Sequence, residues 1–171
     1  MRFFLIGLPG SGKSHWAKLL GQATMLPVLD LDTEIEKHAG KTINEIFQQE
    51  GETAFRDLEN KILIKICERN SFILACGGGT PCFLDNMDII KFQGRSIYLQ
   101  CDVGFVVHNL QRQNEVSKRP LFQQKGHDLK KKSEDLLSER KAFYEKADHI
   151  ITIDRLKEVD ILNQLKMITL N

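Results

Sequence analysis

The chain has 171 residues, of which 42% are hydrophobic and 27% are charged, proportions typical of one soluble globular domain. Its formal net charge of +1 argues against nucleic acid or an anionic membrane surface as a partner. The four cysteines lack the close spacing of a zinc site, and no apolar run approaches the roughly 20 residues that cross a bilayer, so we expect a cytoplasmic protein with reduced thiols.

Short β-rich runs alternate with longer helical patterns along the chain. We predict strands at residues 3–6, 27–30, 71–75, 96–100 and 149–153. We predict helices at residues 13–23, 33–38, 43–49, 52–69, 84–91, 103–111, 129–147 and 157–168. Continuously apolar strands separated by helices are typical of parallel sheets. We therefore expect one α/β domain over residues 1–171, with a five-stranded parallel sheet flanked by helices in three layers.

The first predicted strand leads directly into a phosphate-binding motif. Residues 7–14 read Gly-Leu-Pro-Gly-Ser-Gly-Lys-Ser, which matches GxxxxGK[ST] and precedes a predicted helix. The glycines permit a tight turn whose N–H groups face a phosphate, and the helix N-terminus adds its positive end. In such a P-loop Lys13 reaches the β- and γ-phosphates of a nucleotide, and Ser14 is a ligand of Mg²⁺. The predicted nucleotide-binding residues here are Gly10, Ser11, Gly12, Lys13, Ser14 and His15.

Two aspartates follow the second predicted strand, at the end where ligands bind in open α/β sheets. Asp30 and Asp32 are alternate residues, so on an extended segment both carboxylates face one cleft. The alternative for Asp32 is a structural role as the N-cap of a helix that begins at Thr33.

Arg56 and Glu59 are three residues apart on a predicted helix and can contact each other. Glu59 then either holds the guanidinium in one orientation or forms an ordinary surface ion pair with it. Three glycines at residues 77–79 follow the third strand. They either let an anionic ligand approach backbone N–H groups or form a flexible turn.

A polar stretch at residues 111–126 carries Arg119-Pro120 and interrupts the regular pattern. A loop of this length is either a lid over a site or a surface insertion. Arg140 lies on an apolar helical stripe, four residues after Leu136 and four before Tyr144. Its side chain either extends to solvent or points into a cleft.

These motifs together, in this order, resemble the shikimate kinase family over residues from about 2 to 155. The set consists of the P-loop, Asp30-Leu31-Asp32, Phe55-Arg56-Asp57-Leu58-Glu59, the three glycines, Arg119-Pro120-Leu121 and Arg140. The resemblance implies a fold like that of nucleoside monophosphate kinases. It also implies transfer of the ATP γ-phosphoryl to the 3-hydroxyl of shikimate, a step of aromatic amino acid biosynthesis through chorismate, with Mg²⁺ as cofactor. We expect the enzyme to be a monomer.

The resemblance also implies roles for single residues. Asp32 orients or deprotonates the attacking hydroxyl, and Asp30 lies near Mg²⁺. The carboxylate of shikimate is bound by Arg56, Gly78 and Arg140, while Glu59 supports Arg56 and also contacts the substrate. For the nucleotide, Lys13 and Arg119 neutralise charge that develops on the transferred group, while Arg112 stacks on adenine and Arg155 lines its pocket.

Two positions depart from the family's pattern. Val28 stands where an aromatic residue often precedes the two aspartates, and Phe122 stands where the lid usually has leucine. Both replacements are apolar, so they leave the polar residues of the site intact. The alternatives to this function are a kinase of another small polyol acid, such as gluconate, and a nucleotide-dependent binding module without catalysis.

Overall fold

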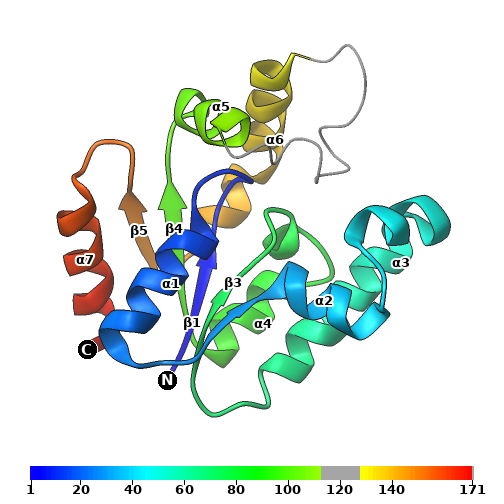
Figure 1. The fold of residues 1–171 in the computed structure, drawn as a ribbon, viewed down its shortest axis with the longest axis horizontal. Helices are drawn as coiled ribbons and strands as arrows, with labels where there is room; N and C mark the ends of the chain where they lie inside the picture. Colours follow the sequence, from blue (N-terminus) through cyan, green and yellow to red (C-terminus); the bar gives the residue numbers. More distant parts are fainter. Residues whose placement is uncertain (113–127, 171) are drawn as a thin grey trace.

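The computed structural model describes residues 1–112 and 128–170, and it contains the predicted five-stranded parallel sheet (Figure 1). The strands lie in the order β2-β3-β1-β4-β5, and every neighbouring pair is parallel. Their bounds are Arg2–Ile6 for β1, Val28–Asp30 for β2, Phe72–Ala75 for β3, Arg95–Gln100 for β4 and His149–Thr152 for β5. The central strands β1 and β3 are buried almost throughout, because helices cover both faces of the sheet.

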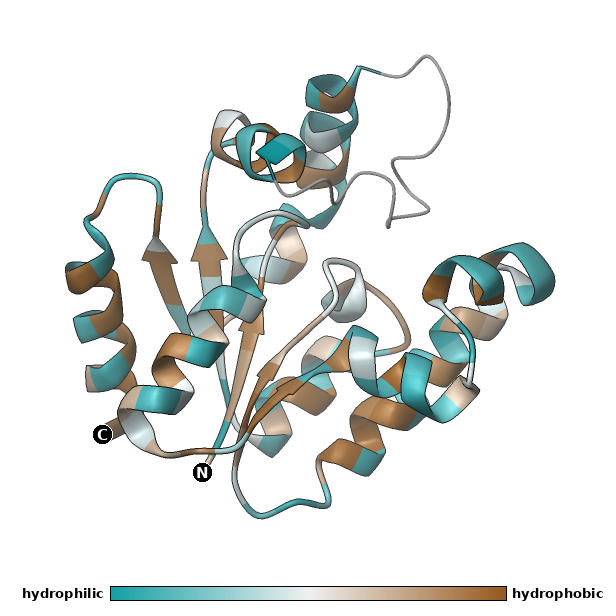
Figure 2. Ribbon diagram, in the orientation of Figure 1, coloured by the Kyte–Doolittle hydropathy of each residue, from teal (hydrophilic) through white to brown (hydrophobic). Residues whose placement is uncertain are grey.

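The helices fall into two layers. They are α1 (Lys13–Thr24), α2 (Leu31–Ala39), α3 (Ile43–Ile66), α4 (Asn86–Gln93), α5 (Val103–Arg112), α6 (Leu129–Tyr144) and α7 (Glu158–Leu170), with a 3₁₀ turn η1 at Thr80–Cys82. Helices α1 and α7 contact each other on one face of the sheet, and α3 and α4 contact each other on the opposite face (Figure 1). Figure 2 shows hydrophobic residues along the strands and polar residues on the outer surfaces of the helices.

Helix α3 combines two predicted helices across a break at one glycine. Gly51 has φ 84° and ψ 173°, a backbone conformation that other residues rarely adopt. Thr42 begins the helix with a capping box, in which its hydroxyl accepts from the Glu45 N–H and the Glu45 carboxylate accepts from the Thr42 N–H. The chain is therefore helical on both sides of Gly51, and the direction changes just before Arg56 and Glu59.

The core lies between the sheet and its helices. The rings of Tyr98 on β4 and Tyr144 on α6 are both buried, with centroids 5.1 Å apart. All four cysteines are free thiols, and Cys67, Cys76 and Cys101 are buried. Among residues 1–112 and 128–170, no helix combines the length and the apolar character that crossing a bilayer requires.

Candidate active site

The P-loop joins the end of β1 to the start of α1 at the centre of the sheet. Gly10 and Gly12 have φ values of 85° and 80°, so the turn requires glycine at both positions. The side chain of Lys13 is buried, and its Nζ donates to the carbonyl oxygens of Gly7 at 3.0 Å and Leu8 at 2.8 Å. The ammonium group therefore lies over the loop in which a nucleotide's phosphates would bind.

Helix α5 supports this loop through a residue that no sequence motif identifies. Nδ2 of Asn109 donates to the carbonyl oxygen of Gly10 at 3.0 Å. A Cβ at Gly10 would lie 2.9 Å from Cγ of Leu110, so the loop and the helix pack too closely for a larger residue. Arg112 follows at the end of α5, where its side chain is exposed.

Ser14 and Asp30 bring two hard oxygen ligands together beside the P-loop. Oγ of Ser14 donates to Oδ2 of Asp30 at 2.5 Å. Magnesium prefers such ligands and usually keeps several waters and substrate phosphates besides one or two protein groups. In the part of the chain that the structure describes, no cluster of three or more His, Cys, Asp or Glu side chains could hold a metal ion. The pair fits a magnesium ion that is held mainly by the nucleotide and water.

The two aspartates have different roles from those that their spacing suggested. The N-cap of α2 is Asp30, whose Oδ1 accepts from the Thr33 N–H at 3.3 Å, so the N-cap alternative for Asp32 is wrong. Because α2 begins at Leu31, Asp32 lies in its first turn and not on an extended segment. Its carboxylate nevertheless reaches the glycine segment, since a Cβ at Gly77 would lie 3.0 Å from Oδ1 of Asp32.

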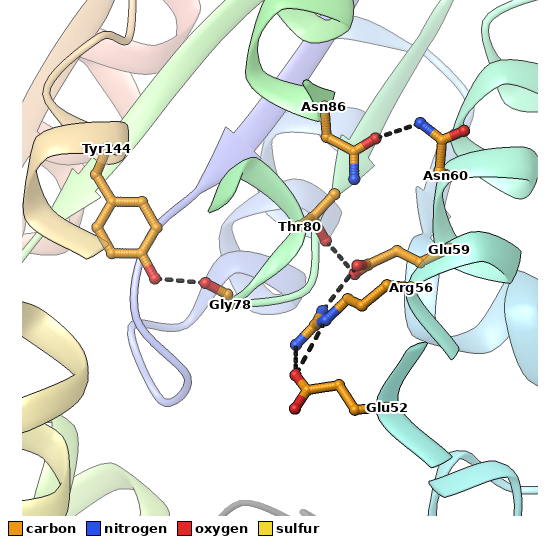
Figure 3. Close-up of polar contacts among 8 residues, drawn as sticks. All are labelled: Glu52, Arg56, Glu59, Asn60, Gly78, Thr80, Asn86 and Tyr144. Atoms are coloured by element: carbon orange, nitrogen blue, oxygen red, sulfur yellow. Dashed lines mark hydrogen bonds and ion pairs between the residues drawn. The ribbon is translucent and has the colours of Figure 1, made fainter. Parts of the chain in front are cut away.

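Arg56 and Glu59 form a buried ion pair. Nη1 of Arg56 donates to Oε2 of Glu59 at 2.8 Å, and the two side chains are 7% and 1% exposed, so the surface-pair alternative is wrong. Oε1 of Glu59 accepts from the hydroxyl of Thr80 at 2.6 Å (Figure 3). The guanidinium also lies over the ring of Phe83, 4.0 Å from its centroid. These contacts fix the planar group in one orientation, as a bidentate carboxylate partner requires.

Arg140 is also buried, with 5% of its surface exposed, so the alternative in which its side chain extends to solvent is wrong. Its Nη1 is a buried donor with no hydrogen-bond partner among the described residues. A buried charged donor without a partner is costly, which indicates that a ligand completes its environment. One turn later on α6, the hydroxyl of Tyr144 donates to the carbonyl oxygen of Gly78 at 2.5 Å (Figure 3).

The three glycines are needed for close packing, which argues against a merely flexible turn. A Cβ at Gly77 would lie 3.2 Å from Oε1 of Glu59, and one at Gly79 would lie 2.7 Å from Nη2 of Arg56. A Cβ at Gly78 would lie 2.6 Å from Cδ of Pro9 in the P-loop. Any larger residue here would displace side chains of the site or the phosphate loop itself.

Burial also affects a thiol in this region. Desolvation raises the pKa of Cys82 to about 11, and the charges of Arg140 and Arg56 oppose that rise. Both guanidinium groups are therefore close enough to act on the same sulfur, although they come from α6 and α3. Helices α3 and α6, which carry these arginines, both contact the 3₁₀ turn.

The remaining predicted site residues either are exposed or lie outside the described part of the chain. His15 is exposed on α1, with its Nε2 3.8 Å from a Glu158 carboxylate oxygen, and Arg155 is exposed after β5. The predicted lid at residues 111–126 lies outside the described residues beyond Arg112, and so does Arg119. A separate groove of about 430 Å³ between α2 and the end of α3 is lined by both signs of charge and includes none of the predicted site residues.

The matching family model and two similar curated proteins all carry the description shikimate kinase. Residues 9–169 match the family model described as shikimate kinase. Proteins named shikimate kinase from Bacteroides fragilis and Flavobacterium psychrophilum are 34% and 36% identical to this chain. The first match covers 92% of this chain and 88% of the relative, and the second covers 98% of both.

Solved structures of the same family resemble this chain over nearly its whole length. Shikimate kinase from Acinetobacter baumannii in complex with shikimate has a TM-score of 0.90 and 30% identity, covering 99% of this chain and 92% of that one. Shikimate kinase from Bacteroides thetaiotaomicron has a TM-score of 0.91 and 29% identity, and the match covers 100% of this chain and 99% of that one. The P-loop fold and the family resemblance are thereby confirmed, and the chain belongs to the shikimate kinase family, whose members are ATP-dependent kinases.

Proposed function

We propose that this enzyme transfers the γ-phosphoryl of ATP to the 3-hydroxyl of shikimate, giving shikimate 3-phosphate and ADP. Family membership supports the reaction class, and the Acinetobacter baumannii relative was solved with shikimate bound. The observation that carries the choice of acceptor is Nη1 of Arg140, a buried cationic donor without a hydrogen-bond partner in the described chain. A small acceptor that bears a carboxylate supplies the partner that this group lacks.

The nucleotide would bind along the P-loop. Backbone N–H groups of the loop and the N-terminus of α1 provide donors for the phosphates. Lys13 would exchange the two loop carbonyls that it now contacts for phosphate oxygens. Ser14 and Asp30 would hold Mg²⁺, which when bound supplies positive charge against the phosphates.

Shikimate would bind between α2, α3, α6 and the glycine segment. Its carboxylate would lie near Arg140, Arg56 and Gly78, and Glu59 would keep Arg56 in position through the 2.8 Å ion pair. Asp32 would accept a hydrogen bond from the attacking hydroxyl, because its carboxylate lies against Gly77 beside this region. Phosphoryl transfer then depends chiefly on positioning and charge stabilisation.

Four of the nucleotide-site assignments stay predictions from the sequence. Arg119 is assigned to charge on the transferred group, although it lies outside the described residues. Arg112, Arg155 and His15 are exposed, and their assignment to ATP rests on the family pattern. We also propose a monomeric, cytoplasmic enzyme that binds no nucleic acid, and gel filtration tests the oligomeric state.

A coupled assay of ADP release tests the reaction. The purified chain is mixed with ATP, Mg²⁺ and shikimate, with gluconate and no-acceptor controls, and the product is identified by ³¹P NMR. We expect ADP release only with shikimate, and its loss in Lys13→Ala. Release with gluconate alone would replace the acceptor but keep the kinase, whereas ATP binding without release from any acceptor would support a binding module.

A further inference from the structure

Tyr144 ends α6 and is fully buried, yet its hydroxyl makes a specific contact with the site. The ring packs against Tyr98, with centroids 5.1 Å apart, and this packing needs no hydroxyl. The Tyr144 Oη–H donates at 2.5 Å to the carbonyl oxygen of Gly78 (Figure 3). Residues 66 positions apart in the chain are thus joined by one hydrogen bond at the edge of the site.

The same hydroxyl also meets Arg140. The two residues are four apart on α6 and are therefore neighbours on one face of the helix. Burial raises the pKa of the Tyr144 phenol, and both the charge of Arg140 and a hydrogen bond from it oppose that rise. The hydroxyl donates to the carbonyl oxygen of Gly78, while Nη1 of the neighbouring Arg140 keeps no hydrogen-bond partner in the described chain. Tyr144 thus bonds one group that the proposed function assigns to the substrate's carboxylate and lies beside another on the same face of α6.

We propose that Tyr144 is a positioning residue that fixes Arg140 and the glycine segment relative to each other for binding the carboxylate of the acceptor. This inference rests on the proposed function. Glycine permits many backbone conformations, so the segment at residues 77–79 has little stiffness of its own. A bond that fixes one carbonyl removes much of that freedom before substrate arrives, which lowers the ordering cost of binding.

The contact also sets the direction of a backbone donor. The described residues contain no cis peptide bond, and in a trans peptide the C=O and N–H point in opposite directions. When Tyr144 holds the carbonyl of Gly78, the N–H of Gly79 points away from α6. Figure 3 shows Arg56 on that other side of the glycine segment. The bond therefore directs this N–H toward the side of the glycine segment on which Arg56 lies.

The test compares Tyr144→Phe with Tyr98→Phe. Each variant removes one hydroxyl from the same pair of stacked rings, but only the first removes the bond to Gly78. We expect Tyr144→Phe to raise the KM for shikimate about tenfold, the usual scale for leaving a buried carbonyl without a partner. The kcat and the KM for ATP should stay within about twofold of wild type, because the carboxylate is remote from the reacting hydroxyl. Tyr98→Phe should leave all three constants unchanged.

A second ligand separates positioning from general loosening. Binding of shikimate and of shikimate methyl ester is measured by calorimetry for wild type and for Tyr144→Phe. If Tyr144 acts through the carboxylate, the variant loses affinity for shikimate and not for the ester. Equal losses for both ligands, or no loss for either, would overturn the proposal.

A conservative replacement keeps the proposal testable if Tyr144→Phe folds poorly. The unnatural residue 4-aminophenylalanine at position 144 keeps a ring and an N–H donor in the same place, and it should restore shikimate affinity. Failure of this replacement in a folded protein would count against the proposal. If wild type itself neither binds nor phosphorylates shikimate, the proposed function fails first, which the assay of ADP release detects separately.

Discussion

Glu52 and Arg56 lie one turn apart on α3, and one carboxylate oxygen of Glu52 contacts two nitrogens of the guanidinium. Oε1 of Glu52 accepts from Nη2 at 3.1 Å and from Nε at 3.3 Å (Figure 3). The side chain of Glu52 is 50% exposed. Glu52 is the first residue after Gly51, where the helix is broken. Arg56 is therefore flanked by two carboxylates, and only Glu59 among them is buried.

The first prediction follows from this charge balance. A carboxylate ligand that approaches Arg56 is repelled by Glu52, so Glu52→Gln should lower the KM for shikimate about three- to fivefold, the scale of a half-exposed charge pair. Glu50→Gln is the matched control, because Glu50 is 45% exposed and pairs with Lys41 instead. A higher KM in Glu52→Gln would mean that Glu52 positions Arg56 and does not compete with the substrate.

The second prediction concerns Arg140. Arg140→Met keeps the length of the side chain but removes a buried charge, so the KM for shikimate should rise at least about 100-fold. The free energy of unfolding, measured in urea, should stay the same or increase by about 1 kcal/mol, because an unpaired buried donor is removed. Arg140→Lys keeps the charge but lacks the planar guanidinium group, so its KM for shikimate should lie between those of wild type and Arg140→Met. Marked destabilisation of Arg140→Met would show that the guanidinium is structural.

The third prediction concerns Asp32. Asp32→Asn keeps the size of the side chain but removes its basicity, so kcat should fall at least about 100-fold. ATP binding, measured by calorimetry, should persist, because Asp32 lies beside Gly77 and not in the P-loop. Asp57→Asn removes an exposed carboxylate on α3 and should leave kcat unchanged. Near-normal turnover of Asp32→Asn would remove Asp32 from the reaction.

The fourth prediction concerns the Cys82 thiol. Its pKa of about 11 means that the reactive thiolate is scarce at neutral pH. The rate of alkylation by iodoacetamide, followed at Cys82 by peptide mass spectrometry, should rise about tenfold per pH unit from pH 8 to 10, without a plateau. Arg140→Met should slow the reaction further at each pH, since the charge of Arg140 opposes the rise of this pKa. A plateau near pH 9 would indicate an ordinary, solvated thiol.

The fold could be predicted because the signals for it are local. Strands β1 and β3 are almost continuously apolar, and the P-loop glycines mark where β1 ends and α1 begins. The ends of elements are less well determined by sequence. Helix α2 begins at Leu31, two residues before the predicted start, so the capping role belongs to Asp30 and not to Asp32.

The site could be predicted only as far as its motifs extend. Spacing alone allowed Arg56 and Glu59 to be exposed, because their burial depends on the distant glycine segment. Three supporting residues carry no motif, since each acts on a partner far along the chain. Thr80 binds Glu59 across 21 residues, Tyr144 binds Gly78 across 66, and Asn109 binds Gly10 across 99. The sequence places Tyr144 on an apolar stripe but gives no sign of the bond that its hydroxyl makes.

The contact between Gly78 and Pro9 has a consequence for inhibitor design. A Cβ at Gly78 would lie 2.6 Å from Cδ of Pro9, so the glycine segment at residues 77–79 packs directly against the Pro9 ring of the phosphate loop. Resistance by substitution at Gly78 would be difficult, because any added side chain would push apart the two surfaces to which the proposed function assigns the substrates.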